Sequence, residues 1–404
     1  MQFVEPKITP IPTGDSTNED MVKVIERAYR ICYKSEDKMK EGSESLIHKL
    51  LYGGEHGQMI HTSPLEHRRI TLAVDDWVAD AVTDWQNERG TSFIYIYPQK
   101  TSSADEHRWL LEGNFRAFFD FIKGYESDED DFKGDYGRRD EARLVINGVL
   151  HGFFPIIFKY LEPYDDTDNA IDWYGCDYIG ESTNYISFHI ITSRDMLQEL
   201  ARHRSMSPNV ESTRYCNYSK RGISFCIPRG YDWTEAEIPF ESMDENALKL
   251  LKPHMHRSHE KYTKQEQCVS DDGSSTYVKV YESDVPKEGY QLTSWIETNE
   301  TEPIDKIISK IDNQSDLFAI ATKICELTYN RAIELGAIPQ EARGLLLGCT
   351  KTEIILTGTY SAWGHFIKLR NDSSADPQMR YLAEKIEDWF MENKANDIRL
   401  YDFY

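Results

Sequence analysis

The amino-acid sequence predicts a mixed α/β fold, because helical and strand patterns alternate along the chain. Residues 19–33 place apolar side chains on one helix face behind the capping candidates Thr17 and Asn18. Residues 184–191 alternate between apolar and polar side chains, as a half-buried strand does. From Thr192 the pattern becomes helical again, so strand and helix follow each other directly.

The other elements are predicted from the same two periods. A helix is expected over about 43–52 and a short strand over 70–74. Thr192 or Ser193 caps the helix that follows the strand 184–191, which places Arg202 and His203 at its end. A strong helix over 316–335 ends at Gly336. Further helical patterns cover 341–348, 353–369 and 377–393.

Composition limits the possible partners. The 404 residues are 40% apolar and 28% charged, which is enough to bury a substantial core. With 46 basic and 69 acidic residues the net charge is −23, which argues against general binding to nucleic acid or to an anionic membrane. No run of 18 uncharged apolar residues and no signal-peptide pattern is found, so we expect a cytoplasmic protein. The seven cysteines form no Cys-x-x-Cys pair and are expected to be reduced thiols.

Three acidic or polar stretches interrupt the apolar patterns. They span residues 125–141, 161–172 and 268–303, and such charge runs are usually solvated loops. We assign them no chemistry.

The clearest cluster of functional residues is basic. Arg202, His203 and Arg204 are followed after seven residues by Ser212, Thr213 and Arg214, and residues 194–221 hold six basic against three acidic side chains. Like charges this close repel unless an anion lies between them, and arginine can bind phosphate through two parallel hydrogen bonds. A bound phosphate would explain this clustering, but a salt-bridge network with Asp195, Glu199 and Glu211 is common for such residues, so both interpretations stay open here.

Two further segments carry polar residues in unusual settings. His61 to His67 place two histidines, a hydroxyl and a carboxylate around a proline, at a spacing that matches no standard zinc pattern. Arg343 and Arg370 lie in apolar helical patterns, where a buried guanidinium needs a carboxylate or a nucleotide as partner. No glycine-rich phosphate loop is present, and no metal site is expected.

Together these segments resemble the flavin-dependent thymidylate synthases. The motif R-H-R, seven residues, then S is present from Arg202 to Ser212, and residues 26–32, 61–67 and 339–380 follow the family's order. The resemblance implies an α/β thymidylate synthase-like fold with large insertions. It implies one domain over 1–404, with an insertion at about 78–183 and a partly inserted, acidic segment at about 232–318.

The resemblance also implies a reaction and a homotetramer with shared active sites. The reaction is the reductive methylation of dUMP to dTMP, with FAD as cofactor and with methylene-tetrahydrofolate and NADPH as co-substrates. Arg202, Ser212 and Arg370 would be catalytic. The residues implied to bind dUMP are Glu199, Arg202, Glu211, Ser212, Thr213, Arg214, Arg343 and Arg370. Those implied to bind FAD are Ser63, Glu66, Arg202, His203, Arg204, Asn209 and His365.

Some positions depart from the family pattern. Thr359 and Ser361 stand where the family commonly has an N-x-R pair that contacts flavin. Residues 113–121 weakly repeat residues 358–366, which suggests that Asn114 and Arg116 present the missing pair. Two alternatives therefore stay open: a divergent flavin-dependent one-carbon transferase acting on another pyrimidine nucleotide, and a nucleotide-binding protein that has lost flavin.

Overall fold

The computed structural model describes most of the chain. The described residues are 2–11, 18–39, 46–47, 51, 62–90, 93–99, 108–123, 136–158, 175–229, 262–269, 276–283, 291–297, 308–309 and 314–393. The chain divides into two compact units, residues 1–230 with 329–404 and residues 231–328.

The first unit is built around an antiparallel sheet, here called the central sheet, with the strand order β2-β7-β13-β8. Its long strands β7 and β13 pair over their full length, from Ser193 opposite Lys351 to Tyr185 opposite Thr359. The strands are β2 (Lys7–Ile11), β7 (Tyr185–Ser193), β8 (Ser207–Val210) and β13 (Lys351–Thr359).

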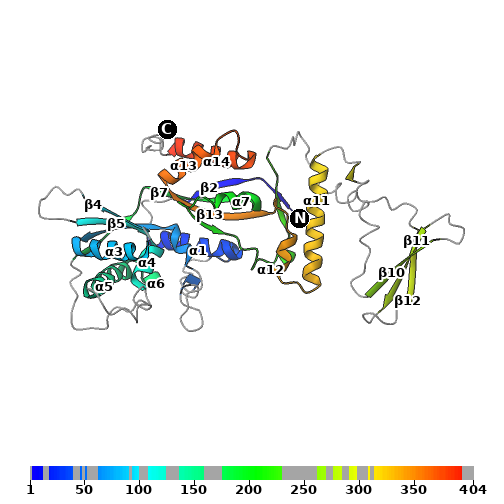
Figure 1. The fold of residues 1–404 in the computed structure, drawn as a ribbon, viewed down its shortest axis with the longest axis horizontal. Helices are drawn as coiled ribbons and strands as arrows, with labels where there is room; N and C mark the ends of the chain where they lie inside the picture. Colours follow the sequence, from blue (N-terminus) through cyan, green and yellow to red (C-terminus); the bar gives the residue numbers. More distant parts are fainter. Residues whose placement is uncertain are drawn as a thin grey trace. The chain divides into compact units, whose positions relative to one another are not determined.

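Helices cover both faces of the central sheet (Figure 1). On one face, α7 (Arg194–Leu200), α13 (Tyr360–Arg370) and α14 (Pro377–Asn393) bury a core that includes Phe188 and Trp363. On the other face, α1 (Asn18–Tyr33) packs Ala28 and Ile31 against the strands. Aromatic rings meet edge to face in this core, as Phe188 does with Trp363 at 5.0 Å between centroids.

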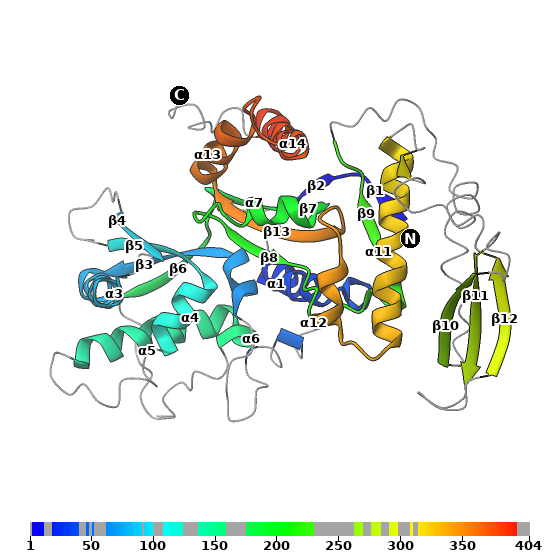
Figure 2. The same ribbon diagram turned by 45° about the vertical axis from the view of Figure 1, so that its right-hand side comes forward.

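A second antiparallel sheet, the outer sheet, has the order β4-β5-β3-β6. Its strands are β3 (Arg69–Asp75), β4 (Ile94–Pro98), β5 (Arg108–Asn114) and β6 (Cys176–Glu181). The helices of this part are α3 (Asp76–Arg89), α4 (Phe115–Lys123), α5 (Tyr136–Phe153) and α6 (Pro155–Phe158) (Figure 2). Their apolar side chains form one continuous core with α1.

Short elements complete the first unit. They are η1 (Glu36–Lys38), η3 (Ser63–His67), the parallel pair β1 (Gln2–Val4) and β9 (Ser224–Cys226), α8 (Tyr218–Arg221), α12 (Pro339–Ala342) and η4 (Arg343–Leu345). The η3 turn, a 3₁₀ helix, leads directly into β3.

The second unit contains a three-stranded antiparallel sheet in the order β10-β11-β12. Its strands are β10 (Tyr262–Val269), β11 (Thr276–Ser283) and β12 (Gln291–Glu297). The helix α11 (Gln314–Glu334) begins in this unit and ends in the first. None of the described helices combines the length and the apolarity needed to cross a membrane.

The mixed α/β class is confirmed, and so are the helices predicted over 19–33, 316–335 and 377–393 and the strands over 70–74 and 184–191. Of the helix predicted over 43–52, residues 46–47 and 51 are described, and they are helical. The helix predicted over 341–348 is reduced to α12 and η4.

Two predictions were wrong. The first half of the helix predicted over 353–369 is strand β13. Its two faces are both buried, with Ile354 and Leu356 in one apolar cluster and Ile355 in another, so the strand loses the period of two. The loop predicted over 268–303 contains β11 and β12, whose valines, isoleucine and aromatic residues favour strands despite the acidic neighbours. Of the other two acidic stretches, residues 136–141 begin α5 and residues 161–172 lie outside the described part.

Candidate functional site

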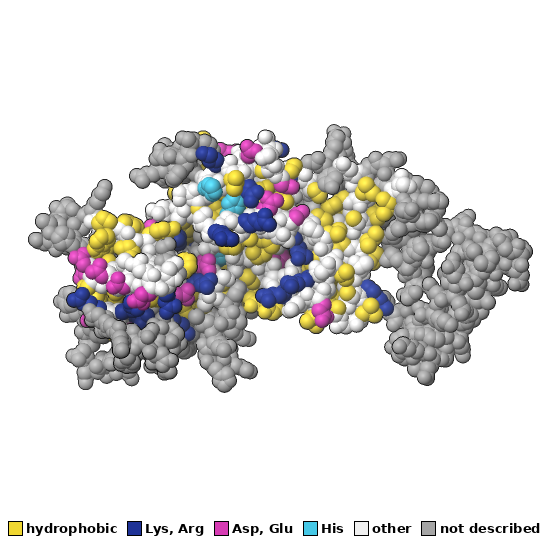
Figure 3. All heavy atoms as spheres, viewed as in Figure 1, with side chains coloured by type: hydrophobic (Ala, Val, Ile, Leu, Met, Phe, Trp, Pro, Cys, Tyr) yellow, Lys and Arg dark blue, Asp and Glu magenta, His cyan; other side chains and the backbone are white. Residues whose placement is uncertain are grey.

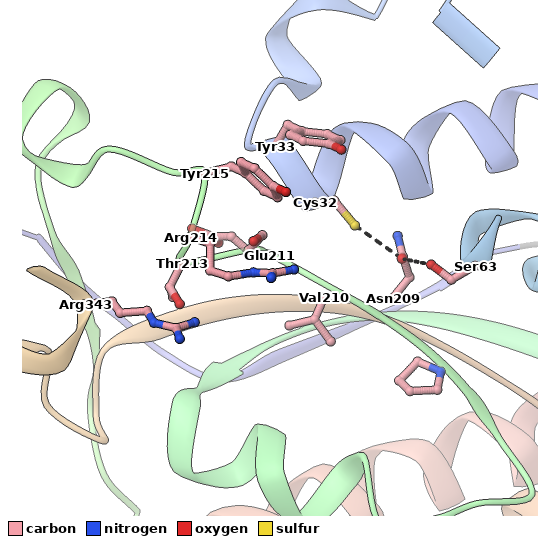
Figure 4. Close-up of a pocket in the computed structure, with 12 residues that line it drawn as sticks. Cys32, Tyr33, Ser63, Asn209, Val210, Glu211, Thr213, Arg214, Tyr215 and Arg343 are labelled. Carbon is pink, nitrogen blue, oxygen red and sulfur yellow. Dashed lines mark hydrogen bonds between the residues drawn. The ribbon is translucent and has the colours of Figure 1, made fainter. Parts of the chain in front are cut away.

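A cavity of about 420 Å³ lies where the end of α1, strand β8 and the turn after β8 meet (Figure 4). This volume is within the range of about 300–1,000 Å³ that is usual for small-molecule sites. The lining residues are Cys32, Tyr33, Ser63, Pro208, Asn209, Val210, Glu211, Ser212, Thr213, Arg214, Tyr215 and Arg343. Seven of them, Ser63, Asn209, Glu211, Ser212, Thr213, Arg214 and Arg343, were predicted as site residues from the sequence.

Backbone hydrogen bonds hold the turn after β8 in place. The N–H of Glu211 donates to the carbonyl of Glu353 at 2.9 Å, which extends the pairing of β8 with β13. The N–H of Ser212 donates to the carbonyl of Cys32 at 3.0 Å and ties the turn to the end of α1. The N–H of Tyr215 closes the turn on the carbonyl of Ser212. Thr213 and Arg214 are thereby placed at the tip, beside the cavity.

Two guanidinium groups give the cavity its positive charge. Arg214 comes from the turn after β8 and Arg343 from η4, and Figure 4 shows both extending toward the same space. In the described part of the chain, neither has a carboxylate within 4.0 Å, although Arg214 packs over the ring of Tyr215 at 5.5 Å. Unneutralised arginines beside the hydroxyls of Ser212 and Thr213 suit a phosphate.

The carboxylate of Glu211, which lines the cavity, is engaged by neighbouring side chains. Its side chain is buried and accepts a hydrogen bond from the Tyr218 hydroxyl at 2.7 Å. Lys34 at 3.5 Å and Lys351 at 3.4 Å neutralise it. Glu211, which the resemblance implied to bind dUMP, thus lines the cavity with a carboxylate that Tyr218 and two lysines already engage.

A buried chain of charges continues behind Glu211. Lys351 also pairs with Glu353, whose other oxygen lies 2.8 Å from Nε2 of His189. Burial opposes the charge of Lys351, but Glu211 and Glu353 outweigh it and raise the pKa of Lys351. Burial likewise opposes the charge of Glu353, yet the hydrogen bond from His189 and the charge of Lys351 lower its pKa to about 2. Lys351 and Glu353 therefore stay ionised behind Glu211.

Asn209 and Cys32 form a part of the cavity wall in which the Asn209 side chain already has hydrogen-bond partners at its oxygen and its nitrogen. The Asn209 side-chain oxygen accepts from Oγ of Ser63 and from Sγ of Cys32, both at 3.2 Å, and its nitrogen donates to the carbonyl of Ala28. Burial raises the pKa of the Cys32 thiol to about 11, so it is protonated at neutral pH. A thiol in this state is no nucleophile.

A second group of predicted residues lies at the end of α7 and on α13, and none of its members lines the cavity. Arg370 donates from Nη1 to Glu199 at 2.6 Å and from Nε to Nε2 of His203 at 3.0 Å. Burial, together with Arg370 and His365, lowers the pKa of His203 to about 4, so its neutral ring can accept this hydrogen bond. We call Glu199, His203 and Arg370 the helix-end cluster.

Exposed basic groups flank the helix-end cluster. Arg202, Arg204 and His365 are exposed, and Figure 3 shows basic and histidine side chains gathered on one face. Within the described ranges, Arg202 and Arg204 have no carboxylate within 4.0 Å. The predicted substrate and flavin residues thus form two groups on one chain, one in the cavity and one at the helix-end cluster.

The remaining flavin predictions concern η3 and the start of α13. Glu66 forms an ion pair with Arg116. His61 lies outside the described residues. The Thr359 hydroxyl accepts from the N–H of Ala362 at 3.3 Å and contacts Ser361 at 3.0 Å, so this pair caps α13.

Sequence analysis missed the two tyrosines of the cavity. Tyr33 and Tyr215 bring their ring centroids within 5.5 Å of each other and form one wall. Their contact depends on how α1 docks beside the turn after β8, and no local pattern reveals it. In the described part of the chain, no group of three or more His, Cys, Asp or Glu side chains could hold a metal ion.

Comparisons with known proteins show the family of this chain. Residues 182–393, just over half of the chain, match the family model described as thymidylate synthase complementing protein. The chain belongs to this family, that of the flavin-dependent thymidylate synthases. The matched segment contains the helix-end cluster and every cavity residue after Ser63.

Individual relatives are similar over short stretches. Flavin-dependent thymidylate synthases of Mycobacterium avium (strain 104) and Mycobacterium tuberculosis (strain ATCC 25177 / H37Ra) are each 48% identical over 44 residues, which are 11% of this chain and 18% of theirs. The chain thus spans about 18% of the length of these curated relatives.

Similar solved structures are distant. ThyX of Helicobacter pylori complexed with FAD and dUMP is 17% identical, with a TM-score of 0.27 over 50% of this chain and 66% of that one. The UMP/dUMP methylase PolB of Streptomyces cacaoi bound with 5-Br dUMP is 13% identical, with a TM-score of 0.31 over 97% and 93%. Likenesses of this extent place no individual site residue.

Proposed function

We propose that this protein is a flavin-dependent thymidylate synthase, which methylates dUMP to dTMP with methylene-tetrahydrofolate and NADPH. The observation that carries the proposal is the cavity in the family segment, where Arg214 and Arg343 converge without a carboxylate partner in the described part of the chain. Their forks and the hydroxyls of Ser212 and Thr213 would bind the nucleotide phosphate.

The helix-end cluster supplies the second part of the proposed site. Arg370 is held at two nitrogens by Glu199 and His203, so its guanidinium has a fixed orientation. A fixed guanidinium beside a pyrimidine would stabilise negative charge on the ring and thereby activate C5. Because the cluster lies outside the cavity of its own chain, we propose a homotetramer in which one subunit's cluster completes another's cavity.

The residues present fit FAD at the helix-end cluster. Arg202 and Arg204 are exposed, without a carboxylate partner among the described residues, and lie near His365, so they suit a diphosphate. Ser63 would add a hydroxyl from the cavity side. FAD would supply the hydride that reduces the transferred one-carbon unit. Thr359 and Ser361 would not help, since they cap α13.

Purified protein tests the proposal directly. We expect it to be yellow, to absorb in the flavin bands, to oxidise NADPH in a dUMP-dependent way, and to form dTMP when methylene-tetrahydrofolate is also present. Colourless protein that FAD cannot reconstitute, but that still binds dUMP, would reject the enzyme and favour a nucleotide-binding protein.

One observation favours the divergent enzyme as a second candidate. Glu211, the carboxylate of the lining, is already engaged by Tyr218, and its neighbour Val210 presents an apolar side chain to the cavity. No carboxylate in the described lining is then free to select a ribose. Turnover of UMP at a rate comparable to that of dUMP would support this candidate.

A further inference from the structure

The two sheets of the first unit share one plan. In the outer sheet the chain runs β3, α3, β4, β5, α4. The central sheet uses β7, α7, β8, β13 and α13 in the same order, but the elements from α8 to η4 lie between β8 and β13 in the chain. In both, the first and last strands pair antiparallel, and the short middle strand pairs antiparallel with the last. A further strand, β6 or β2, flanks the first strand in each. We call β3–α4 the first repeat and β7–α13 the second.

Glycine packing supports this equivalence. Gly113 and Gly358 each stand one residue before the end of the last strand. A Cβ on Gly113 would meet Ile94 of the short strand and Phe118, both at 3.2 Å. One on Gly358 would meet Met206 beside the short strand at 3.0 Å and Trp363 at 3.4 Å. Phe118 and Trp363 each lie five residues after their glycine, so the same contacts recur.

The helix caps recur as well. The Asn114 side chain accepts from the N–H of Ala117 at 2.8 Å, as the Thr359 hydroxyl does from Ala362 at 3.3 Å. Two residues after the cap, the first repeat has Arg116 and the second has Ser361. The repeats therefore differ in charge at one defined position.

Arg116 connects the first repeat to the cavity. Its Nη1 pairs with Glu66 of η3, and its Nε lies 3.5 Å from Asp120. Side chains three residues apart in a 3₁₀ helix lie on the same side, so Glu66 and Ser63 share one side of η3. Ser63 lines the cavity and donates to Asn209. The guanidinium thus holds the turn that carries a cavity residue.

We infer that Arg116 is a positioning residue of the ligand site: through Glu66 it sets η3, and with it Ser63, against the cavity. The inference rests on the proposed function. The first repeat thereby supplies a guanidinium at the position where the second repeat has Ser361.

The test compares four variants with the wild type: Arg116→Ala, Arg116→Lys, Glu66→Gln and the double variant Glu66→Gln/Arg116→Ala. Arg139→Ala is the matched control, because it removes the pair with Glu88, 2.7 Å long, that joins α5 to the first repeat. FAD affinity is measured by flavin fluorescence, the KM for dUMP by NADPH oxidation, and stability by thermal unfolding.

We expect Arg116→Ala to weaken FAD affinity or raise the KM for dUMP about tenfold, the size expected for one lost charged hydrogen bond. Arg116→Lys should recover part of this loss, and the double variant should be no worse than Arg116→Ala. If Arg116→Ala has the same FAD affinity and the same KM for dUMP as Arg139→Ala, the inference about Arg116 is wrong, while the proposed function is unaffected. Wild-type protein that binds neither FAD nor dUMP would reject the proposed function and the inference with it.

Discussion

At the scale of single residues, the site depends on which charges are neutralised. Arg370 has a carboxylate and an imidazole as partners, whereas Arg214 and Arg343 have no carboxylate partner in the described ranges. The sequence left a carboxylate partner and a bound nucleotide open for Arg343 and Arg370, and the structure pairs Arg370 with Glu199. Arg214 and Arg343 are therefore better candidates than Arg370 for binding a phosphate.

Arg214→Gln and Arg343→Gln should each raise the KM for dUMP at least tenfold, because each removes a charged hydrogen-bond donor worth about 1.5–3 kcal/mol. Lys220→Gln is the control: this lysine is exposed on α8, close in sequence but outside the lining. Steady-state kinetics with dUMP as the varied substrate decide the matter. Equal KM values for the three variants would contradict the assignment.

His203 should make the protein less stable in acid. Its pKa is about 4 in the folded protein, against about 6.5 for an exposed imidazole. Between these values the unfolded chain binds a proton that the folded protein excludes, so stability falls as the pH falls from about 6.5 to about 4. His203→Gln should lose less unfolding free energy from pH 7 to pH 5, by on the order of 1 kcal/mol after solvent screening. Urea unfolding at both pH values measures the difference.

At the scale of elements, sequence periodicity predicted the helices that bury one face. It failed for strand β13, which buries both faces. The helices over 19–33 and 377–393 each expose one face, so their apolar period is visible in the sequence. Strand β13 is paired on both edges and buried on both faces, and its apolar residues at 354–356 resemble a helix core. Tertiary pairing, absent from any local window, decides such a segment.

Glycine packing gives a stability prediction at this scale. Gly358→Ala should destabilise the protein by about 1–3 kcal/mol, because the added carbon must displace Met206 and Trp363 in a packed core. Gly152→Ala is the control: no atom lies within 4 Å of the added carbon, and alanine favours the helix α5 by up to about 1 kcal/mol. Thermal unfolding should move in opposite directions for the two variants.

At the scale of the whole molecule, residues that belong to one sequence motif lie in two different places in the fold. Arg202 and Ser212 are ten positions apart, yet Ser212 lines the cavity and Arg202 flanks the helix-end cluster, because strand β8 runs between them. Chain spacing brought seven of the predicted residues to the lining of one cavity. It could not reveal which of them face the same space, since that depends on how α1, β8 and η4 pack.

This separation leads to a test of the shared active site. Arg214→Ala removes one of the two guanidinium groups of the cavity, and Arg370→Ala removes that of the helix-end cluster. Each variant alone should have strongly reduced turnover at limiting dUMP while keeping its oligomeric state. If one subunit's cavity is completed by another's cluster, oligomers containing both variants regain intact sites. Random assembly would restore about a quarter of the sites. The two variants, coexpressed with different tags and purified over both, should therefore oxidise NADPH in the presence of dUMP and methylene-tetrahydrofolate. Mixed oligomers that stay inactive would show that both groups serve the same chain.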